Sequence, residues 1–230
     1  MTVYLLSDSS LEFPPARLAR YDGLLCIGGD LTPQRLINAY KNGIFPWFSA
    51  QEPILWWSPD PRLVLYPDKI NISKSLNKKI RKSYFEVTID KAFEEVIRAC
   101  SKYRGERRKS TWLVDQMVEA YINLHRLGYA HSVETWRDGR LAGGLYGVSL
   151  GRVFFGESMF SYVSDASKTA LAGLCSYLKH HDFDLIDCQV TSEHLLSMGA
   201  EEISRGRFLK QLTASIKTDS LTGRWNFEGF

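Results

Sequence analysis

Three strand-like segments follow one another in the second half of the chain, and they limit the possible folds more than any other feature. Residues 130–136 and 141–148 flank Asp138-Gly139, a pair that favours the two-residue turn of a β-hairpin. A second turn at Leu150-Gly151 leads into residues 152–159. We therefore expect three antiparallel strands side by side in one sheet.

The segments that follow predict a crossover from this sheet to a fourth strand. Apolar periodicity favours a helix over residues 166–178, and residues 185–190 alternate as a strand. Short helices are expected over 192–198 and 206–216. The whole order predicts an α+β fold, with a mixed, mostly antiparallel sheet between helices.

This order of elements resembles the core of the N-acetyltransferase (GNAT) fold. Acetyl-CoA enzymes of that fold usually carry a glycine-rich loop after the third of these strands to bind pyrophosphate. This chain has GESMFSYVSDASK (156–168) in that place. Fold analogy therefore points to acyl transfer onto an amine, while the sequence counts against acyl-CoA as the donor.

The first part of the chain is less regular. Residues 43–62 contain four prolines and three tryptophans, so they cannot form one helix or a central strand and are interpreted as an aromatic loop. A change of pattern near Asp60 predicts a small N-terminal domain over 1–60 and a catalytic domain over 61–230. Before the loop we expect a helix over 33–42. Between the loop and the hairpins we expect strands over 63–66 and 85–89 and helices over 73–82 (capped by Ser73), 91–101 (capped by Asp90) and 114–127.

Composition favours a folded protein without a membrane anchor. The chain has 230 residues, 44% of them hydrophobic, and no apolar run approaches the ~18 residues of a membrane span. No signal peptide is recognisable at its start, so a cytoplasmic protein is expected. The four widely spaced cysteines favour reduced, mostly buried thiols over disulfides or a zinc site.

Basic residues are concentrated in two segments although the formal net charge is only +3. Residues 69–82 hold six basic side chains and no acidic one, and residues 102–109 hold five beside Glu106. The rest of the chain is acidic. Such segments favour an anionic partner such as a nucleic acid, although a solvated surface gives the same pattern.

Asp187 and Gln189 are expected on one face of their strand, with Cys188 on the other. A carboxylate and an amide on an apolar strand could accept hydrogen bonds and take up a proton, or they could be a buried polar pair that fixes a loop. Glu157 ends the preceding strand and would lie near Asp187 if the two strands are neighbours. A salt bridge to Lys168 is the alternative for Glu157.

Aromatic residues gather before residue 60 and again at Trp112. Most of them are expected to pack in the core or between the two domains. One ring facing a cleft could instead stack on a nucleotide base. The aromatic set is Trp47, Phe48, Trp56, Trp57 and Trp112.

Together these segments resemble the leucyl/phenylalanyl-tRNA–protein transferases of bacteria. The resemblance runs from about residue 13 to residue 212. Its most specific stretches are FPWF (45–48), WWSPDPR (56–62), GESMF (156–160) and LIDCQ (185–189). It implies an enzyme that moves Leu or Phe, and less readily Met, from aminoacyl-tRNA to proteins with N-terminal Arg or Lys, and so marks them for degradation.

The resemblance also implies roles for individual residues. Gln189 would accept a hydrogen bond from the attacking amine, Asp187 would polarise that contact or act as the base, and Glu157 would hold the ammonium or ribose end of the charged adenosine. The substrate-binding residues would be Trp47, Trp112, Phe154, Leu145, Met159, Leu174 and Ile186. The candidates for tRNA binding are Lys74, Lys78, Lys79, Arg81, Lys82, Arg104, Arg107 and Arg108. No metal or cofactor is expected, and the partners would be Leu-tRNA, Phe-tRNA and the acceptor protein, bound by a monomer.

Two other functions remain open from the sequence. An acyl-CoA-dependent N-acyltransferase would keep the fold and the amine chemistry but lacks its pyrophosphate loop. A non-catalytic tRNA-binding module would explain the basic segments and the aromatic residues, but it leaves Asp187, Gln189 and Glu157 without a role.

Overall fold

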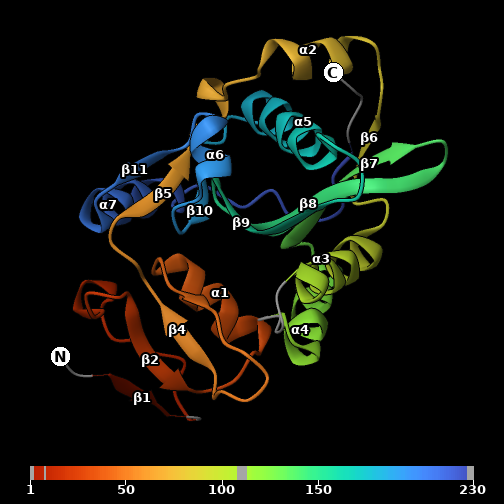
Figure 1. Cartoon of the computed structure of the whole chain (residues 1–230). Coiled ribbons are helices and arrows are strands. Elements are labelled where there is room, and N and C mark those ends of the chain that lie inside the picture. The colour runs from red at the N-terminus through yellow and green to blue at the C-terminus, as the bar shows by residue number, and fades with distance from the viewer. Residues whose placement is uncertain (1–2, 8, 108–112, 227–230) are drawn as a thin grey trace.

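Two β-sheets organise the chain, and the polypeptide passes from the smaller to the larger between Trp57 and Arg62 (Figure 1). The computed structural model describes residues 3–7, 9–107 and 113–226, with the backbone alone for residues 103–107. The strand order is β1-β2-β4-β3 in the smaller sheet and β11-β5-β10-β9-β8-β7-β6 in the larger.

The smaller sheet corrects the interpretation of residues 43–62 as a loop. Its elements are β1 (Tyr4–Leu6), β2 (Leu24–Gly28), α1 (Pro33–Lys41), β3 (Phe45–Pro46) and β4 (Leu55–Trp57). β4 is a central strand, paired with both β2 and β3. It can form because the prolines of the segment lie outside its three residues, with Pro46 confined to the edge strand β3.

The larger sheet confirms the predicted order of three antiparallel strands, crossover helix and fourth strand. Its strands are β5 (Arg62–Leu65), β6 (Glu86–Ile89), β7 (Ala130–Arg137), β8 (Arg140–Leu150), β9 (Val153–Ser161), β10 (Leu185–Gln189) and β11 (Glu201–Ile203). β9 and β10 run parallel, joined by α5 (Ala166–His180), and every other neighbouring pair is antiparallel. The sequence did not predict β11, which has only three residues.

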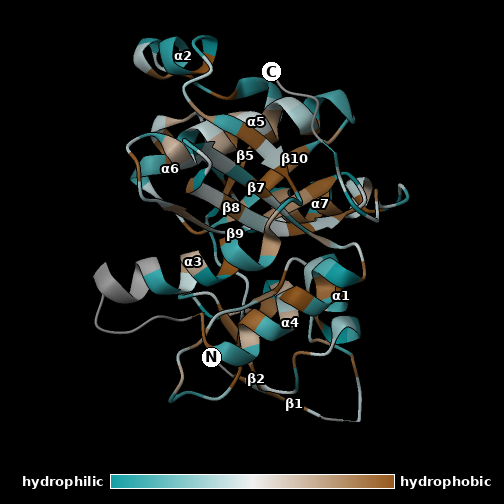
Figure 2. Ribbon diagram, turned by 90° about the vertical axis from the view of Figure 1, so that its right-hand side faces the viewer, coloured by the Kyte–Doolittle hydropathy of each residue, from teal (hydrophilic) through white to brown (hydrophobic). Residues whose placement is uncertain are grey.

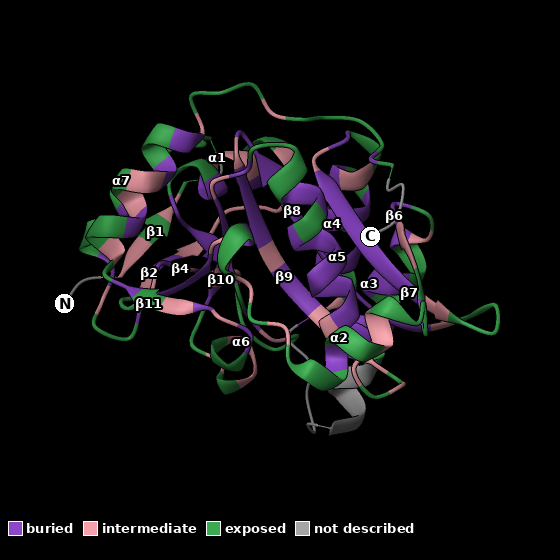
Figure 3. Cartoon of the chain, turned by 90° about the horizontal axis from the view of Figure 1, so that it is seen from above, coloured by how far each residue is buried: buried purple, intermediate pink, exposed green. Residues whose placement is uncertain are grey.

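Helices cover both faces of the larger sheet. α3 (Phe93–Arg107) and α4 (Asp115–Arg126) pack on the face toward the smaller sheet, and α5 packs on the other (Figure 1). β7, β8, β9 and α5 are almost wholly buried, while α2 (Lys74–Arg81) stands outside α5 and is exposed (Figure 3). α6 (Glu193–Ser197) and α7 (Arg205–Ser215) follow β10. Within the described ranges no helix is both long and apolar enough to cross a lipid bilayer.

Two predicted helix caps, Ser73 and Asp90, can be compared with the structure. The side chain of Ser73 caps α2 by accepting the backbone N–H of Leu76, as predicted. The expectation for Asp90 was wrong, because α3 begins only at Phe93. The Asp90 carboxylate instead accepts the backbone N–H of Trp225 and lies 2.8 Å from Nδ1 of His131, so it ties the C-terminal segment to β7.

Candidate active site

A cavity of about 210 Å³ opens between the smaller and the larger sheet. Its wall combines β3 and Trp47 with parts of β8, β9, α5 and α6 and with the end of β10. Most of the lining is apolar. Glu157 is the one carboxylate among the described residues that line it.

Nearly all of the residues expected to bind the substrate line this cavity. Leu145 and Met159 face each other as partners on β8 and β9, so their side chains lie on the same face of the sheet. Trp112 lies outside the described residues. The expected residues that line the cavity are Trp47, Leu145, Phe154, Met159, Leu174 and Ile186.

Glu157 is buried on β9 and all of its described hydrogen bonds come from other elements. Oε1 accepts from the hydroxyl of Tyr40 on α1 and from Nε2 of Gln189, each over 2.7 Å. Oε2 accepts from the hydroxyl of Tyr121 on α4 over 2.9 Å. Burial raises the pKa of Glu157 to about 7, and the nearby charge of Asp187 adds to that rise, although the three hydrogen bonds oppose it.

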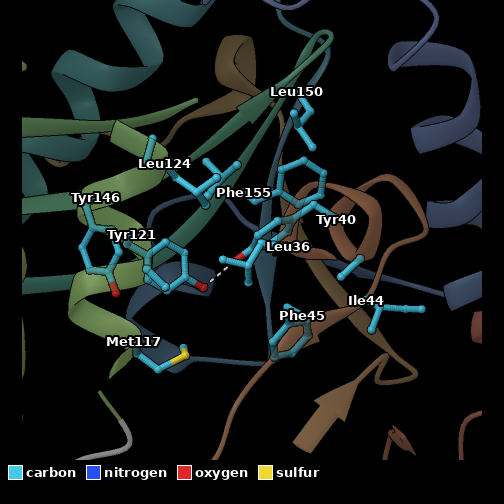
Figure 4. Packing of buried hydrophobic residues seen from close by; sticks show 14 of the residues in the cluster. Leu36, Tyr40, Ile44, Phe45, Met117, Tyr121, Leu124, Tyr146, Leu150 and Phe155 are labelled. Carbon is cyan, nitrogen blue, oxygen red and sulfur yellow. Dashed lines mark hydrogen bonds between the residues drawn. The ribbon is translucent and has the colours of Figure 1, made fainter. Parts of the chain in front are cut away.

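The two tyrosines also touch each other, with their hydroxyl oxygens 2.5 Å apart (Figure 4). Three contacts between oxygens therefore join Tyr40, Tyr121 and Glu157, but the two hydroxyls supply only two hydrogens. When Glu157 is protonated, its carboxyl group supplies the third hydrogen and donates one of these bonds instead of accepting it. Burial also holds the pKa of both tyrosines well above the ordinary value, so the carboxyl group is the member of this cluster that exchanges a proton near neutral pH.

Asp187 and Gln189 end β10, but the regular alternation expected there is broken by a bulge between them. Gln189 has a positive φ of 65°, and it lines the cavity together with Cys188. Asp187 is absent from the described lining and is fully buried against Arg62. The expectation that Asp187 and Gln189 would lie on one face of the strand, with Cys188 on the other, is corrected accordingly, because a bulge shifts one residue out of register.

Asp165 lies at the start of α5, and its carboxylate pairs with two lysines. Nζ of Lys79 lies 2.7 Å from its Oδ2, and Nζ of Lys168 lies 3.7 Å from its Oδ1. The hydrogen bond from Lys79 lowers the pKa of Asp165. The alternative of a salt bridge between Glu157 and Lys168 is therefore wrong.

The basic residues expected to bind tRNA fall into two groups. α2 presents a hydrophilic outer face in which Lys79 is half-buried by its ion pair (Figure 2). The second group lies outside the part of the chain that the structure describes. This applies to the side chains of Arg104 and Arg107 on α3 and to the whole of Arg108. The exposed members of the first group are Lys74, Lys78, Arg81 and Lys82.

Sequence reasoning missed three residues of the site, namely Tyr40, Tyr121 and Arg62. Tyr40 and Tyr121 stand on apolar faces of amphipathic helices, where a tyrosine indicates a core residue. Arg62 closes the WWSPDPR stretch, so its place in that motif was the one available signal. Their contacts with β9 and β10 depend on tertiary packing and leave no local pattern.

The described cysteines and histidines offer no second site of this kind. None of the four cysteines forms a disulfide, and burial raises the pKa of the Cys26 and Cys175 thiols to about 12. Across the described ranges no group of three or more His, Cys, Asp or Glu residues is placed to hold a metal ion.

Comparison with known proteins assigns the chain to a family. Residues 64–213 match the sequence profile of the leucyl/phenylalanyl-tRNA protein transferases, and residues 29–60 match the N-terminal domain of the same family. The leucyl/phenylalanyl-tRNA–protein transferase of Desulforapulum autotrophicum is 56% identical over 100% of both chains. That of Syntrophobacter fumaroxidans is 59% identical over 94% of this chain and 92% of its own.

Among solved structures, a GCN5-related N-acetyltransferase from Anabaena variabilis aligns with a TM-score of 0.37 and 12% identity, over 79% of this chain and 44% of its own. The sequence matches decide the assignment, because they extend through both sheets and include Glu157, Asp187 and Gln189. The chain belongs to the leucyl/phenylalanyl-tRNA protein transferase family and is a transferase enzyme.

Proposed function

We propose that the chain transfers Leu or Phe, and less readily Met, from aminoacyl-tRNA to the α-amino group of proteins that begin with Arg or Lys, and so marks them for degradation. The observation that supports this most strongly is the cavity, in which an apolar pocket meets Glu157 and Gln189. The names of the relatives state the same class of reaction.

The chemistry needs orientation and one mobile proton. An aminoacyl ester is already activated, so the enzyme holds amine and ester in line and supplies no energy. The neutral amine attacks the ester carbonyl, the C–N bond forms, and the C–O bond to the ribose of the terminal adenosine breaks. The nitrogen loses a proton and the departing ribose oxygen gains one, so a single group can accept the proton and return it.

Glu157 and Gln189 are suited to these tasks. A carboxyl group with a pKa of about 7 can both take and release a proton at neutral pH. The Nε2 group of Gln189 is engaged with Glu157, which leaves its side-chain carbonyl for the attacking amine. Asp187 does not line the cavity, so it acts through Gln189.

The apolar part of the cavity suits the donor side chain. Leu145, Leu174 and Ile186 give it apolar walls, and Met159 is flexible enough to pack against either Leu or Phe. Trp47 and Phe154 border the same space and are the candidates for the terminal adenosine and the side chain next to it. A pocket of this kind discriminates only weakly between Leu and Phe as donor side chains.

The body of the tRNA would meet the basic surface of α2. Exposed lysines and arginines there can contact phosphates of the acceptor stem without reading its sequence. The enzyme would act as a monomer in the cytoplasm, where charged tRNA is available.

An acyl-CoA donor is disfavoured by the segment that leads from β9 into α5. Residues 156–168 read GESMFSYVSDASK, so the glycine-rich loop that would hold the pyrophosphate of CoA is missing there.

A single transfer assay tests the proposal. The protein is mixed with radiolabelled Leu-tRNA and a peptide that begins with Arg, with neither ATP nor CoA present, and the label in the peptide is counted. A matched peptide that begins with Ala is the control. Label on the Arg peptide alone is expected, and no label on either peptide while the charged tRNA stays intact contradicts the proposal.

A further inference from the structure

A buried ion pair joins β5 to β10 next to residues that line the cavity. Nε of Arg62 donates to Oδ1 of Asp187 over 2.7 Å, and Nη2 donates to Oδ2 over 2.6 Å. Both side chains are fully buried. Two parallel hydrogen bonds of this kind fix both the position and the plane of the carboxylate.

Two aromatic rings enclose the guanidinium group of Arg62. Its Cζ lies 4.9 Å from the ring centroid of Phe45 on β3 and 4.5 Å from that of Phe208 on α7. Phe45 belongs to the smaller sheet and also lines the cavity. The position of Asp187 therefore depends on the packing of the smaller sheet against the larger one.

Stability does not explain this arrangement well. A buried ion pair often adds little stability compared with apolar side chains of similar size, and Nη1 of Arg62 is buried without a hydrogen-bond partner among the described residues. What the pair supplies is a carboxylate held at one place. Oδ1 of Asp187 also accepts the backbone N–H of Gln189 over 2.9 Å.

That backbone hydrogen bond holds Gln189 in a conformation it would rarely adopt unaided. Its φ of 65° lies in the left-handed region, which glutamine normally avoids because of its Cβ. From this backbone the side chain reaches Glu157, with 2.7 Å between Nε2 and Oε1. The hydrogen bonds thus run in sequence from Arg62 through Asp187 and Gln189 to the one carboxylate of the described cavity lining.

We propose that Arg62 is a positioning residue that acts through Asp187 to set the conformation of Gln189, and that Asp187 does not receive the proton of the attacking amine. Asp187 is paired with Arg62 through both of its oxygens and does not belong to the described lining of the cavity, whereas Glu157 does. This inference rests on the proposed transfer reaction. It makes Asp187 a support for Gln189 and leaves Glu157 as the proton acceptor.

The test compares Arg62→Met and Arg62→Lys with a matched control, Arg35→Met. Arg35 on α1 is also a fully buried arginine paired with a carboxylate, its Nη2 lying 3.1 Å from Oδ2 of Asp30, but it has no described contact with the cavity lining. For each variant we would measure the melting temperature, kcat and KM for Leu-tRNA, and hydrogen exchange at the backbone amide of Gln189.

Arg62→Met is expected to lower kcat about 10- to 100-fold, the loss typical of one charge-assisted hydrogen bond, with KM for Leu-tRNA nearly unchanged. Exchange at the Gln189 amide should accelerate at least about tenfold, because its acceptor is no longer fixed. Arg62→Lys keeps the positive charge but cannot make the two parallel hydrogen bonds to Asp187. Its kcat should therefore lie between those of Arg62→Met and the wild type. Arg35→Met should lower the melting temperature but change neither kcat nor the exchange rate of the Gln189 amide.

Several outcomes would overturn the inference. One is a folded Arg62→Met protein with wild-type kcat and wild-type exchange at Gln189. Another is an Asp187→Asn change that lowers kcat as strongly in the Arg62→Met background as in the wild type, because residues that act through one another are not additive. If Arg62→Met does not fold, the same comparisons apply to Arg62→Lys. If the wild-type protein shows no transfer, the proposed function fails, and the exchange measurement still decides whether Arg62 positions Gln189.

Discussion

Gln189 donates its side-chain N–H to Oε1 of Glu157 over 2.7 Å, across the boundary between the parallel strands β10 and β9. The bond uses the amide nitrogen and leaves the amide oxygen for a substrate amine. Gln189→Ala should therefore lower kcat roughly 100-fold, with a smaller effect on KM for charged tRNA. Steady-state kinetics checks this, and Gln211→Ala is the matched control because Gln211 bonds Tyr66 instead. Equal kinetics in both variants would contradict the role of Gln189.

The hydroxyl of Tyr40 should tune the acidity of Glu157. Hydrogen bonds from hydroxyls favour the ionised carboxylate and lower its pKa, so Tyr40→Phe removes one of the groups that oppose the effect of burial. The pKa of Glu157 should rise further, and the acidic limb of kcat/KM against pH should move to higher pH by roughly 1 unit. Tyr66→Phe is the control. An acidic limb that stays in place in Tyr40→Phe would mean that Glu157 is not the group that titrates.

Glu157 should also make the stability of the protein depend on pH. Its folded pKa of about 7 lies above its ordinary value of 4.5, so the folded state binds more protons than the unfolded state between these values. Stability should therefore fall as pH rises from 4.5 to 7 and stay level above that, a loss of roughly 3 kcal/mol from this group. Urea unfolding at two pH values, one near each end of this window, measures it. Glu157→Gln should show a smaller fall than the wild type, and an identical fall would refute the raised pKa.

The size of the donor pocket should depend on Leu174, which lines the cavity from α5. Leu174→Ala enlarges the pocket, so kcat/KM for Phe-tRNA relative to Leu-tRNA should rise roughly tenfold. Leu178→Ala provides the control, because Leu178 is fully buried on the same helix and is not part of the described cavity lining. Both changes should lower stability by roughly 2–5 kcal/mol. A donor ratio that changes equally in both variants would indicate a general loosening of α5.

The exposed lysines Lys78 on α2 and Lys82 just after it should act through charge alone. Lys78→Glu and Lys82→Glu should raise KM for charged tRNA and leave kcat unchanged, most strongly at low salt. The slope of log affinity against log salt concentration should fall by about 1 for each phosphate that the variant no longer neutralises. Lys217→Glu is the control, since Lys217 is exposed beyond α7. If all three variants bind tRNA equally well, α2 is not the tRNA surface.

Much of the fold could be predicted because its elements are specified locally. Asp138 and Gly139 have the positive φ angles, 52° and 70°, that their hairpin turn requires. Ser73 caps α2 where the sequence suggested it. β4 escaped prediction because a three-residue strand in a proline-rich segment is stabilised by its neighbours rather than by its own pattern.

The candidate site was only partly predictable, since its hydrogen bonds connect distant parts of the chain. The cavity-lining residues on β8, β9 and β10 follow from strand patterns and from the family motifs. Tyr40 and Tyr121 lie 117 and 36 residues from Glu157, and Arg62 lies 125 residues from Asp187. The bulge at Gln189 had no sequence signal either, because it depends on the Asp187 carboxylate.

The hydrogen bond between Tyr40 and Glu157 makes the state of the active-site carboxylate depend on how the smaller sheet packs against the larger one. Tyr40 comes from α1, beside the smaller sheet, so the carboxylate loses a donor whenever that part shifts away from the larger sheet. Mild denaturant should then lower turnover near neutral pH while the circular dichroism of the larger sheet is still intact. A half-assembled molecule could hold a charged tRNA by α2 without consuming its ester.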